Sequence, residues 1–152
     1  MISPRMAFIV AAVVAVPAGP LVAQDLGGDP AAGEQVYKKC MVCHRIGAGA
    51  KNAVGPTQNG LIGRTAGTAE GFSYSSLNKH AGENGLAWTE QNVFDYLPDP
   101  SAFLKKYLTD KGKADLATGS TKMSFKLADP KERKDVIAYI KKAGGTAAAP
   151  TK

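Results

Sequence analysis

The sequence predicts an all-α fold of about five helices. Three aspartate–proline pairs, at 29–30, 99–100 and 129–130, each place a side chain that accepts hydrogen bonds from backbone N–H groups just before a proline. Aspartate is a favoured N-cap, and proline suits the first helical position, where its missing N–H would have no intrahelical partner. No stretch shows the alternation of a convincing strand, and no internal repeat is present. The regular structure is therefore expected to be helical.

The first predicted helix runs from about Pro30 to Lys39, with Ala32, Val36 and Cys40 spaced four residues apart along one face. Gly33 lies within this helix, although glycine costs a helix roughly 1 kcal/mol relative to alanine. We therefore expect a second helix to approach closely at Gly33.

A long loop follows the first helix. From 47 to 71 the chain is rich in glycine and has little periodicity, which indicates a loop wrapped over something that is not protein. A short helix is predicted at about 73–79, with Tyr74 and Leu77 facing inward.

Two helices come next along the chain. Thr89 is the predicted cap of a helix over about 90–97, which Pro98 ends. The Asp99–Pro100 pair begins a helix that ends near Gly112. Its apolar stripe consists of Phe103, Leu104, Tyr107 and Leu108.

The last helix has the strongest local signals. Asp129 and Glu132 have the spacing of a capping box, in which each side chain binds the backbone N–H of the other residue. Lys141 and Lys142 favour the C-terminal end of the helix dipole, and Gly144-Gly145 ends the helix.

Both ends of the chain are expected to lie outside the folded domain. Arg5 precedes an apolar run from Met6 to Val16, and small residues then lead to Gln24, which is the layout of a secretory signal peptide cleaved after Ala23. The run is shorter than the roughly 20 apolar residues that span a bilayer, and an uncleaved anchor or a core helix is the weaker alternative. The predicted units are a cleaved signal peptide at 1–23, one domain at 24–145 and a disordered tail at 146–152.

The expected mature chain is moderately basic. The full chain has 19 lysine and arginine residues against 13 aspartate and glutamate residues. Removal of 1–23 takes only Arg5 from this balance, which leaves 18 against 13. Because an export signal argues against nucleic acid as the partner, the positive excess predicts a partner that is an acidic protein surface or an anionic lipid.

The only two cysteines and one of the two histidines form the motif Cys40-Met41-Val42-Cys43-His44. This C-x-x-C-H order is typical of c-type haem attachment, where two thiols add to porphyrin vinyl groups and the histidine ligates iron. A thiol oxidoreductase normally places C-x-x-C beside a βαβ pattern, which this chain lacks. Zinc needs four ligands; the only thiols and imidazoles are those of this motif and His80, and the adjacent Cys43 and His44 would have difficulty reaching one tetrahedral ion. We therefore expect one covalently bound haem c.

With haem at this motif, His44 is the expected proximal ligand, and the ligand on the opposite face decides the function. A filled sixth position favours electron transfer, whereas an open one binds small molecules. Apart from Met41, within the attachment turn, Met123 is the only thioether of the expected mature chain. Met123 and His80 are the strong candidates, and a lysine is a weaker one. However, a methionine in a loop is ordinarily a gap filler, and the polar neighbours of His80 predict an exposed side chain.

Further motifs follow along the chain in a characteristic order. They are Gly33 and Tyr37, C-x-x-C-H at 40–44, Gly55-Pro56, Gly63-Arg64, Phe72-Ser73-Tyr74-Ser75, Asn78, Trp88, Tyr96, Thr121-Lys122-Met123 and Val136-Ile137-Ala138-Tyr139-Ile140. From about 25 to 144 the sequence resembles the class I cytochromes c, and within them the bacterial cytochromes c2. This resemblance implies the cytochrome c fold, with helices wrapped around one covalently attached haem.

The resemblance assigns the iron ligands and the covalent attachment. Cys40 and Cys43 would carry the haem, and His44 would be the proximal ligand. A hydrogen bond from the other ring nitrogen of His44 to the Pro56 carbonyl would orient the ring. Met123 would be the distal ligand.

The resemblance also implies residues around the haem. Arg64, Tyr74 and Trp88 would surround the buried propionates, where a cation and polar donors offset the cost of burying carboxylates. Tyr96 and Asn78 would lie near the methionine and tune the reduction potential through hydrogen bonds.

Two structural expectations come with the family. Gly33 and Tyr139 would meet where the first and last helices cross. The stretch from Ser101 to Gly119 departs from the short mitochondrial-like pattern and supplies an extra helix before the methionine, as in the longer members of the c2 group.

The function implied by the resemblance is one-electron transfer in the bacterial periplasm, not catalysis. The donor would be a cytochrome bc1 complex, and the acceptor a photosynthetic reaction centre or a terminal oxidase. The protein would be a monomer without stable membrane insertion after cleavage, and a lysine ring would steer it onto acidic partners. The candidate lysines are Lys38, Lys39, Lys51, Lys79, Lys105, Lys106, Lys111, Lys113, Lys122 and Lys126. A haem-based enzyme or gas sensor with a labile sixth ligand is the alternative.

Overall fold

The computed structural model describes residues 25–145; the predicted signal peptide, with its cleavage after Ala23, and the predicted tail at 146–152 lie outside them. The all-α prediction with five α-helices is confirmed. The helices are α1 (Pro30–Tyr37), α2 (Ser76–Glu83), α3 (Glu90–Tyr96), α4 (Pro100–Asp110) and α5 (Pro130–Gly144), with a 3₁₀ turn, η1 (Ala114–Leu116), after α4. Within 25–145, β pairing is limited to one antiparallel bridge, Thr65 to Ala87. No helix in this range is long and apolar enough to cross a membrane.

The predicted helix caps are confirmed. All three aspartates accept hydrogen bonds from backbone N–H groups in the first turns of α1, α4 and α5, and a proline follows each of them. Thr89 caps α3 in the same way. The capping box of α5 forms only in part. Asp129 accepts a hydrogen bond from the N–H of Glu132, but the carboxylate of Glu132 binds Nζ of Lys39, directly before Cys40, at 2.7 Å.

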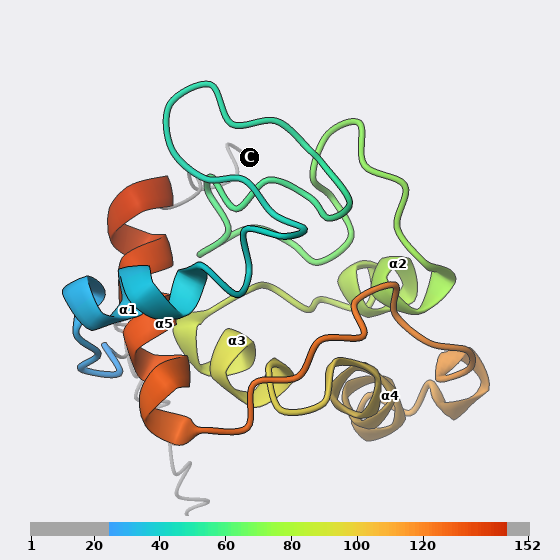
Figure 1. Cartoon of the computed structure of the whole chain (residues 1–152). Helices are drawn as coiled ribbons and strands as arrows, with labels where there is room; N and C mark the ends of the chain where they lie inside the picture. The colour runs from blue at the N-terminus through green and yellow to red at the C-terminus, as the bar shows by residue number, and fades with distance from the viewer. Residues whose placement is uncertain (1–24, 146–152) are drawn as a thin grey trace, which may run out of the picture.

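Helices α1 and α5 cross on one side of the molecule, with Gly33 at the contact (Figure 1). A Cβ atom on Gly33 would lie 1.9 Å from the carbonyl oxygen of Asp135 and 2.9 Å from Cβ of Tyr139. The rings of Tyr37 and Tyr139 pack beside this contact with centroids 5.2 Å apart. The predicted close approach at Gly33 is therefore confirmed, and it sets the direction in which α1 leads into the attachment motif.

Helix α2 begins and ends later than the predicted 73–79. The hydroxyl of Ser75 accepts a hydrogen bond from the N–H of Asn78, so Ser75 is the extended cap residue and the helix begins after it. Ala81 is fully buried, one turn beyond the buried Leu77. Burial of this apolar face carries the helix past the predicted end, through sequence that is locally polar.

Helix α4 lies in the stretch that the sequence resemblance predicts to supply an extra helix before Met123. The predicted apolar stripe is confirmed, because Leu104 and Leu108 are fully buried and Phe103 packs against the core. The ring centroid of Phe103 lies 5.9 Å from that of Tyr96 and 6.4 Å from that of Trp88. The inserted helix thus supports two aromatic side chains from behind.

The elements lie on two sides of a central space. The long segment 38–75, which contains no helix, arches over one side, while α3, α4 and the segment 117–128 lie on the other (Figure 1). The backbone N–H of Leu127 donates to the carbonyl of Leu97 at 2.8 Å, which fastens the second segment to the end of α3. A cavity of about 260 Å³ lies between the two sides.

Candidate functional site

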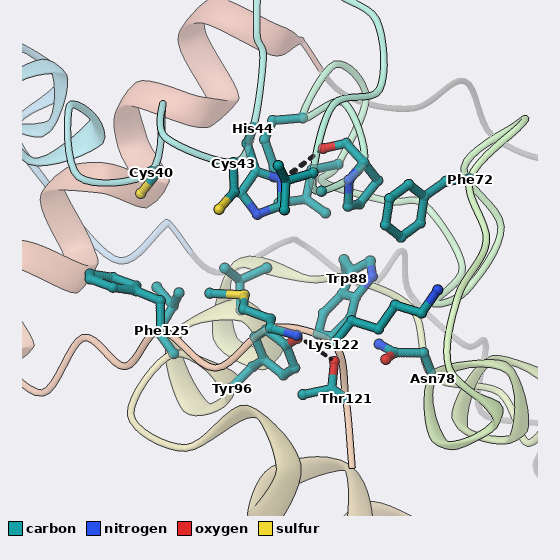
Figure 2. Close-up of a pocket in the computed structure, with 18 of the residues that line it drawn as sticks. Cys40, Cys43, His44, Phe72, Asn78, Trp88, Tyr96, Thr121, Lys122 and Phe125 are labelled. Carbon is teal, nitrogen blue, oxygen red and sulfur yellow. Dashed lines mark hydrogen bonds between the residues drawn. The ribbon is translucent and has the colours of Figure 1, made fainter.

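The C-x-x-C-H motif forms a tight turn directly after α1. The N–H groups of Cys43 and His44 both donate to the carbonyl of Cys40, at 3.0 and 2.9 Å. Arg45 closes the turn by donating from Nη1 to the carbonyls of Met41 and His44. As a result, Cys40, Cys43 and His44 face the same cavity (Figure 2). Both thiols are free, and burial raises the pKa of Cys40 to about 11.

The ring of His44 is held in one orientation. Its Nδ1 lies 2.8 Å from the carbonyl oxygen of Pro56. Gly55 lies against the ring, so closely that a Cβ atom there would be 2.3 Å from Cε1 of His44. Burial lowers the pKa of His44, which favours the neutral ring. A neutral ring that donates from Nδ1 to Pro56 keeps the lone pair of Nε2 free for a metal.

The segment 121–125 forms the opposite wall of the cavity (Figure 2). Met123 is half-buried there, with its N–H 3.4 Å from the hydroxyl of Thr121. The N–H of Thr121 donates to the hydroxyl of Ser101 at 3.2 Å. Burial raises the pKa of Tyr96, and the neighbouring side chains of Thr121 and Asn78 oppose this rise. Lys122 extends across the cavity mouth and donates to the carbonyl of Ser73 at 2.6 Å. The methionine segment is therefore anchored from both sides.

A third group of cavity residues surrounds the guanidinium of Arg64. Its Nη1 donates to the carbonyls of Thr57 and Asn59, both at 3.2 Å. Its Nε is buried and has no hydrogen-bond partner within residues 25–145. Tyr74 and Trp88 line the same cavity, and burial lowers the pKa of Arg64 and raises that of Tyr74. A buried N–H group without a partner is costly, and a carboxylate placed here would satisfy it.

The donor set suits a covalently attached haem. Two free thiols lie on one turn, His44 has an oriented ring, and a thioether comes from the opposite wall. The unpartnered N–H of Arg64 is suited to a propionate. Across residues 25–145, no three histidine, cysteine, aspartate or glutamate side chains gather to hold a metal ion on their own.

All ten residues that the sequence and its family resemblance assign to the site line this one cavity. They are Cys40, Cys43, His44, Pro56, Arg64, Tyr74, Asn78, Trp88, Tyr96 and Met123. Their individual roles toward a haem stay predictions.

The other candidates for the sixth ligand differ in whether they line the cavity. His80 does not line the cavity, and the expectation that it is exposed was wrong: it is half-buried, with Nδ1 3.4 Å from the carbonyl of Leu116. The tertiary contact between α2 and η1 covers it, which its polar sequence neighbours do not reveal. Lys39 and Lys122 do line the cavity.

Gln58 is a site residue that the sequence analysis missed. It is 8% exposed, lines the cavity and contacts the ring of His44. A polar residue in a glycine-rich loop is ordinarily expected at the surface. Its position two residues after the Gly55-Pro56 pair was the only available clue.

Comparisons with known proteins agree on one family. The family model described as cytochrome c matches residues 30–144. The chain is 63% identical over 114 residues to cytochrome c2 iso-2 of Rhodospirillum centenum, covering 75% of this chain and 94% of that protein. It is 62% identical over 112 residues to a cytochrome c2 of Rhodopseudomonas palustris, covering 74% and 96%. The solved structure of cytochrome c2 from Rhodospirillum centenum superposes with a TM-score of 0.76 at 62% identity, covering 77% of this chain and 99% of that one.

Proposed function

This chain belongs to the cytochrome c family, as a bacterial class I cytochrome c2 with one covalently attached haem c, and from that premise we propose how it carries electrons. His44 and Met123 are the axial iron ligands, and Cys40 and Cys43 hold the haem. One observation carries this assignment: His44, oriented through Nδ1, and the Met123 segment face each other across one cavity. The haem iron supplies the chemistry by gaining and losing one electron.

The protein side chains determine how easily this happens. The thioether of Met123 is a weak donor, and His/Met ligation raises the reduction potential relative to more strongly donating pairs. The hydrogen bond from His44 to Pro56 holds the ring against rotation. With both axial positions filled by anchored side chains, the site needs little rearrangement when the redox state changes.

The polar side chains of the cavity act at two places. One group binds the haem carboxylates, and the other lies beside Met123. Arg64, Tyr74 and Trp88 surround the propionates, and the buried Nε of Arg64 gains a partner there. Asn78 and Tyr96 line the cavity with Met123 and tune the potential, which is supported by the effect of the Asn78 side chain on the pKa of Tyr96.

The site of action is the bacterial periplasm, reached through a signal peptide at 1–23 that is cleaved near Ala23. The carrier is a monomer that takes electrons from a cytochrome bc1 complex and delivers them to a photosynthetic reaction centre or a terminal oxidase. This assignment rests on the family and on the layout of the first 23 residues.

Docking uses the rim of the cavity. Lys39 and Lys122 line it, and so do the exposed apolar side chains Val54 and Phe125. Several of the candidate lysines form exposed ion pairs, among them Lys39 with Glu132 and Lys106 with Asp110, both at 2.7 Å, and exposed pairs of this kind contribute little to stability. The rim therefore combines positive charge with a small apolar surface, which suits brief contact with an acidic partner.

A redox titration tests the proposed ligation and electron count together. The visible spectrum should follow a single one-electron transition, and a sulfur-to-iron charge-transfer band should appear on oxidation. A spectrum that changes when small neutral ligands are added at low concentration, or that lacks this band, would favour the labile sixth position of an enzyme or sensor.

Electron transfer to an acidic redox partner should slow steeply with added salt. Raising the ionic strength from 0.01 to 0.15 M shortens the screening length from about 30 to about 8 Å, and the second-order rate should fall roughly tenfold. Stopped-flow measurements with Lys39→Gln should show about a two- to threefold loss at low salt, whereas Lys134→Gln, outside the cavity lining, should retain the wild-type rate. Salt-independent rates would contradict docking through the lysines.

A further inference from the structure

We propose that Gln58 is a positioning residue for the axial histidine: its amide oxygen is a second hydrogen-bond acceptor for Nδ1–H of His44 and lowers the reduction potential. The inference rests on the proposed ligation by His44. It concerns a side chain to which the family resemblance assigned no role.

The geometry places the Gln58 amide directly at the ring. Its terminal amide atom Nε2 lies 2.8 Å from Nδ1 of His44 and 3.4 Å from the carbonyl oxygen of Pro56. Nδ1 itself is 2.8 Å from the same Pro56 oxygen. The three groups therefore form a compact triangle, and Gln58 is only 8% exposed within it.

The proton count decides which amide atom faces the ring. A histidine that binds iron through Nε2 must carry its remaining proton on Nδ1, so Nδ1–H donates to Pro56. An amide NH₂ at 2.8 Å would then place one donor against another. Rotating the amide by 180° about its terminal bond exchanges its nitrogen and oxygen at nearly the same positions. In the haem-bound protein, Oε1 of Gln58 therefore takes the place beside Nδ1–H.

A second acceptor has a defined electronic effect. Hydrogen bonds accepted from Nδ1–H make the imidazole a more basic ligand, and a more basic ligand stabilises the oxidised iron. The bond lies in a buried region, where water does not weaken it. Gln58 should therefore shift the equilibrium toward the oxidised state and restrict the tilt of the ring.

The test compares haem-loaded wild-type protein with Gln58→Leu and Gln58→Met, which keep much of the side-chain volume but remove the acceptor. Spectroelectrochemistry should show the reduction equilibrium shifted about three- to tenfold toward the reduced form, the size expected for one hydrogen bond. In the reduced protein, the NMR signal of His44 Nδ1–H should move upfield in both variants. Gln58→Met, with its flexible side chain, provides the result if Gln58→Leu does not fold.

Thr57→Val is the matched control, because this neighbouring polar side chain does not line the cavity and its hydroxyl lies 3.4 Å from the Arg45 carbonyl. It should change the reduction equilibrium less than about twofold. A potential that falls in Gln58→Leu would overturn the proposal and indicate that the amide donates to Pro56 instead. A raised potential with an unmoved Nδ1–H signal would also overturn it, because the variant then changes only the local polarity.

The readouts separate this proposal from the ligand assignment. Met123 ligation is judged by the sulfur-to-iron band of the wild-type protein, whereas the Gln58 proposal is judged by the His44 Nδ1–H signal. If the sulfur-to-iron band is absent, the Nδ1–H signal can still be measured, because Nδ1 lies beside Pro56, across the cavity from Met123.

Discussion

Met123→Ala should abolish the sulfur-to-iron charge-transfer band of the oxidised protein and lower its reduction potential on the order of a few hundred mV. Alanine cannot ligate iron, so water or a stronger donor takes the sixth position, and the oxidised state gains stability. Lys39 and Lys122 both line the cavity, so an amine released from Glu132 or from the Ser73 carbonyl is one such donor. The optical spectrum and a redox titration of the purified haem protein measure both effects.

His80→Ala is the control for this result. His80 lies in α2 against the Leu116 carbonyl and does not line the cavity, so its variant should keep the band and the potential. The substitution should reduce the stability only by the small contribution of the contact between His80 in α2 and Leu116 in η1. An unchanged spectrum in Met123→Ala, or loss of the band in His80→Ala, would contradict the ligand assignment.

Gly33→Ala should lower the free energy of unfolding by about 3 kcal/mol, although alanine is the better helix former by roughly 1 kcal/mol. The added Cβ would lie 1.9 Å from the carbonyl oxygen of Asp135, and this oxygen belongs to the backbone of α5. A backbone atom cannot rotate away, so α1 must move as a unit. Guanidinium unfolding of the oxidised haem protein, followed by circular dichroism, measures the loss.

The control lies one residue further along the same helix. Glu34 is exposed, so Glu34→Ala should change the stability by no more than about 0.5 kcal/mol. Because α1 leads directly into Cys40, displacement of α1 in Gly33→Ala should also perturb the haem spectrum. Wild-type stability in Gly33→Ala would mean that the two helices are not in close contact at this position.

Much of the fold follows from local signals. The aspartate caps and their prolines act over two or three residues, so their hydrogen bonds in α1, α4 and α5 were predictable from the sequence. Gly33 was informative for a different reason: a residue that is unfavourable in its own helix indicates a contact from outside it.

Three of the wrong details depended on contacts between distant segments. The helix predicted at 73–79 ended too early, because burial of Ala81 extends it through polar sequence. His80 was expected at the surface, but η1 covers it. Glu132 had the spacing of a capping box, yet its carboxylate binds Lys39, 93 residues away in the chain. In each case a long-range contact outweighed a weaker local preference.

The candidate site was also predictable in part from the sequence and in part only from the fold. The order of residues along the chain was sufficient for the attachment motif, because two thiols and a histidine within five positions have few other uses. The family motifs identified ten residues that the fold then gathers around one cavity. Only the folded chain brings Gln58 to the ring of His44 and leaves Nε of Arg64 without a partner. Covalent attachment depends on spacing within one turn, whereas hydrogen bonding to the ring of His44 depends on how a loop packs, and packing is set by the whole chain.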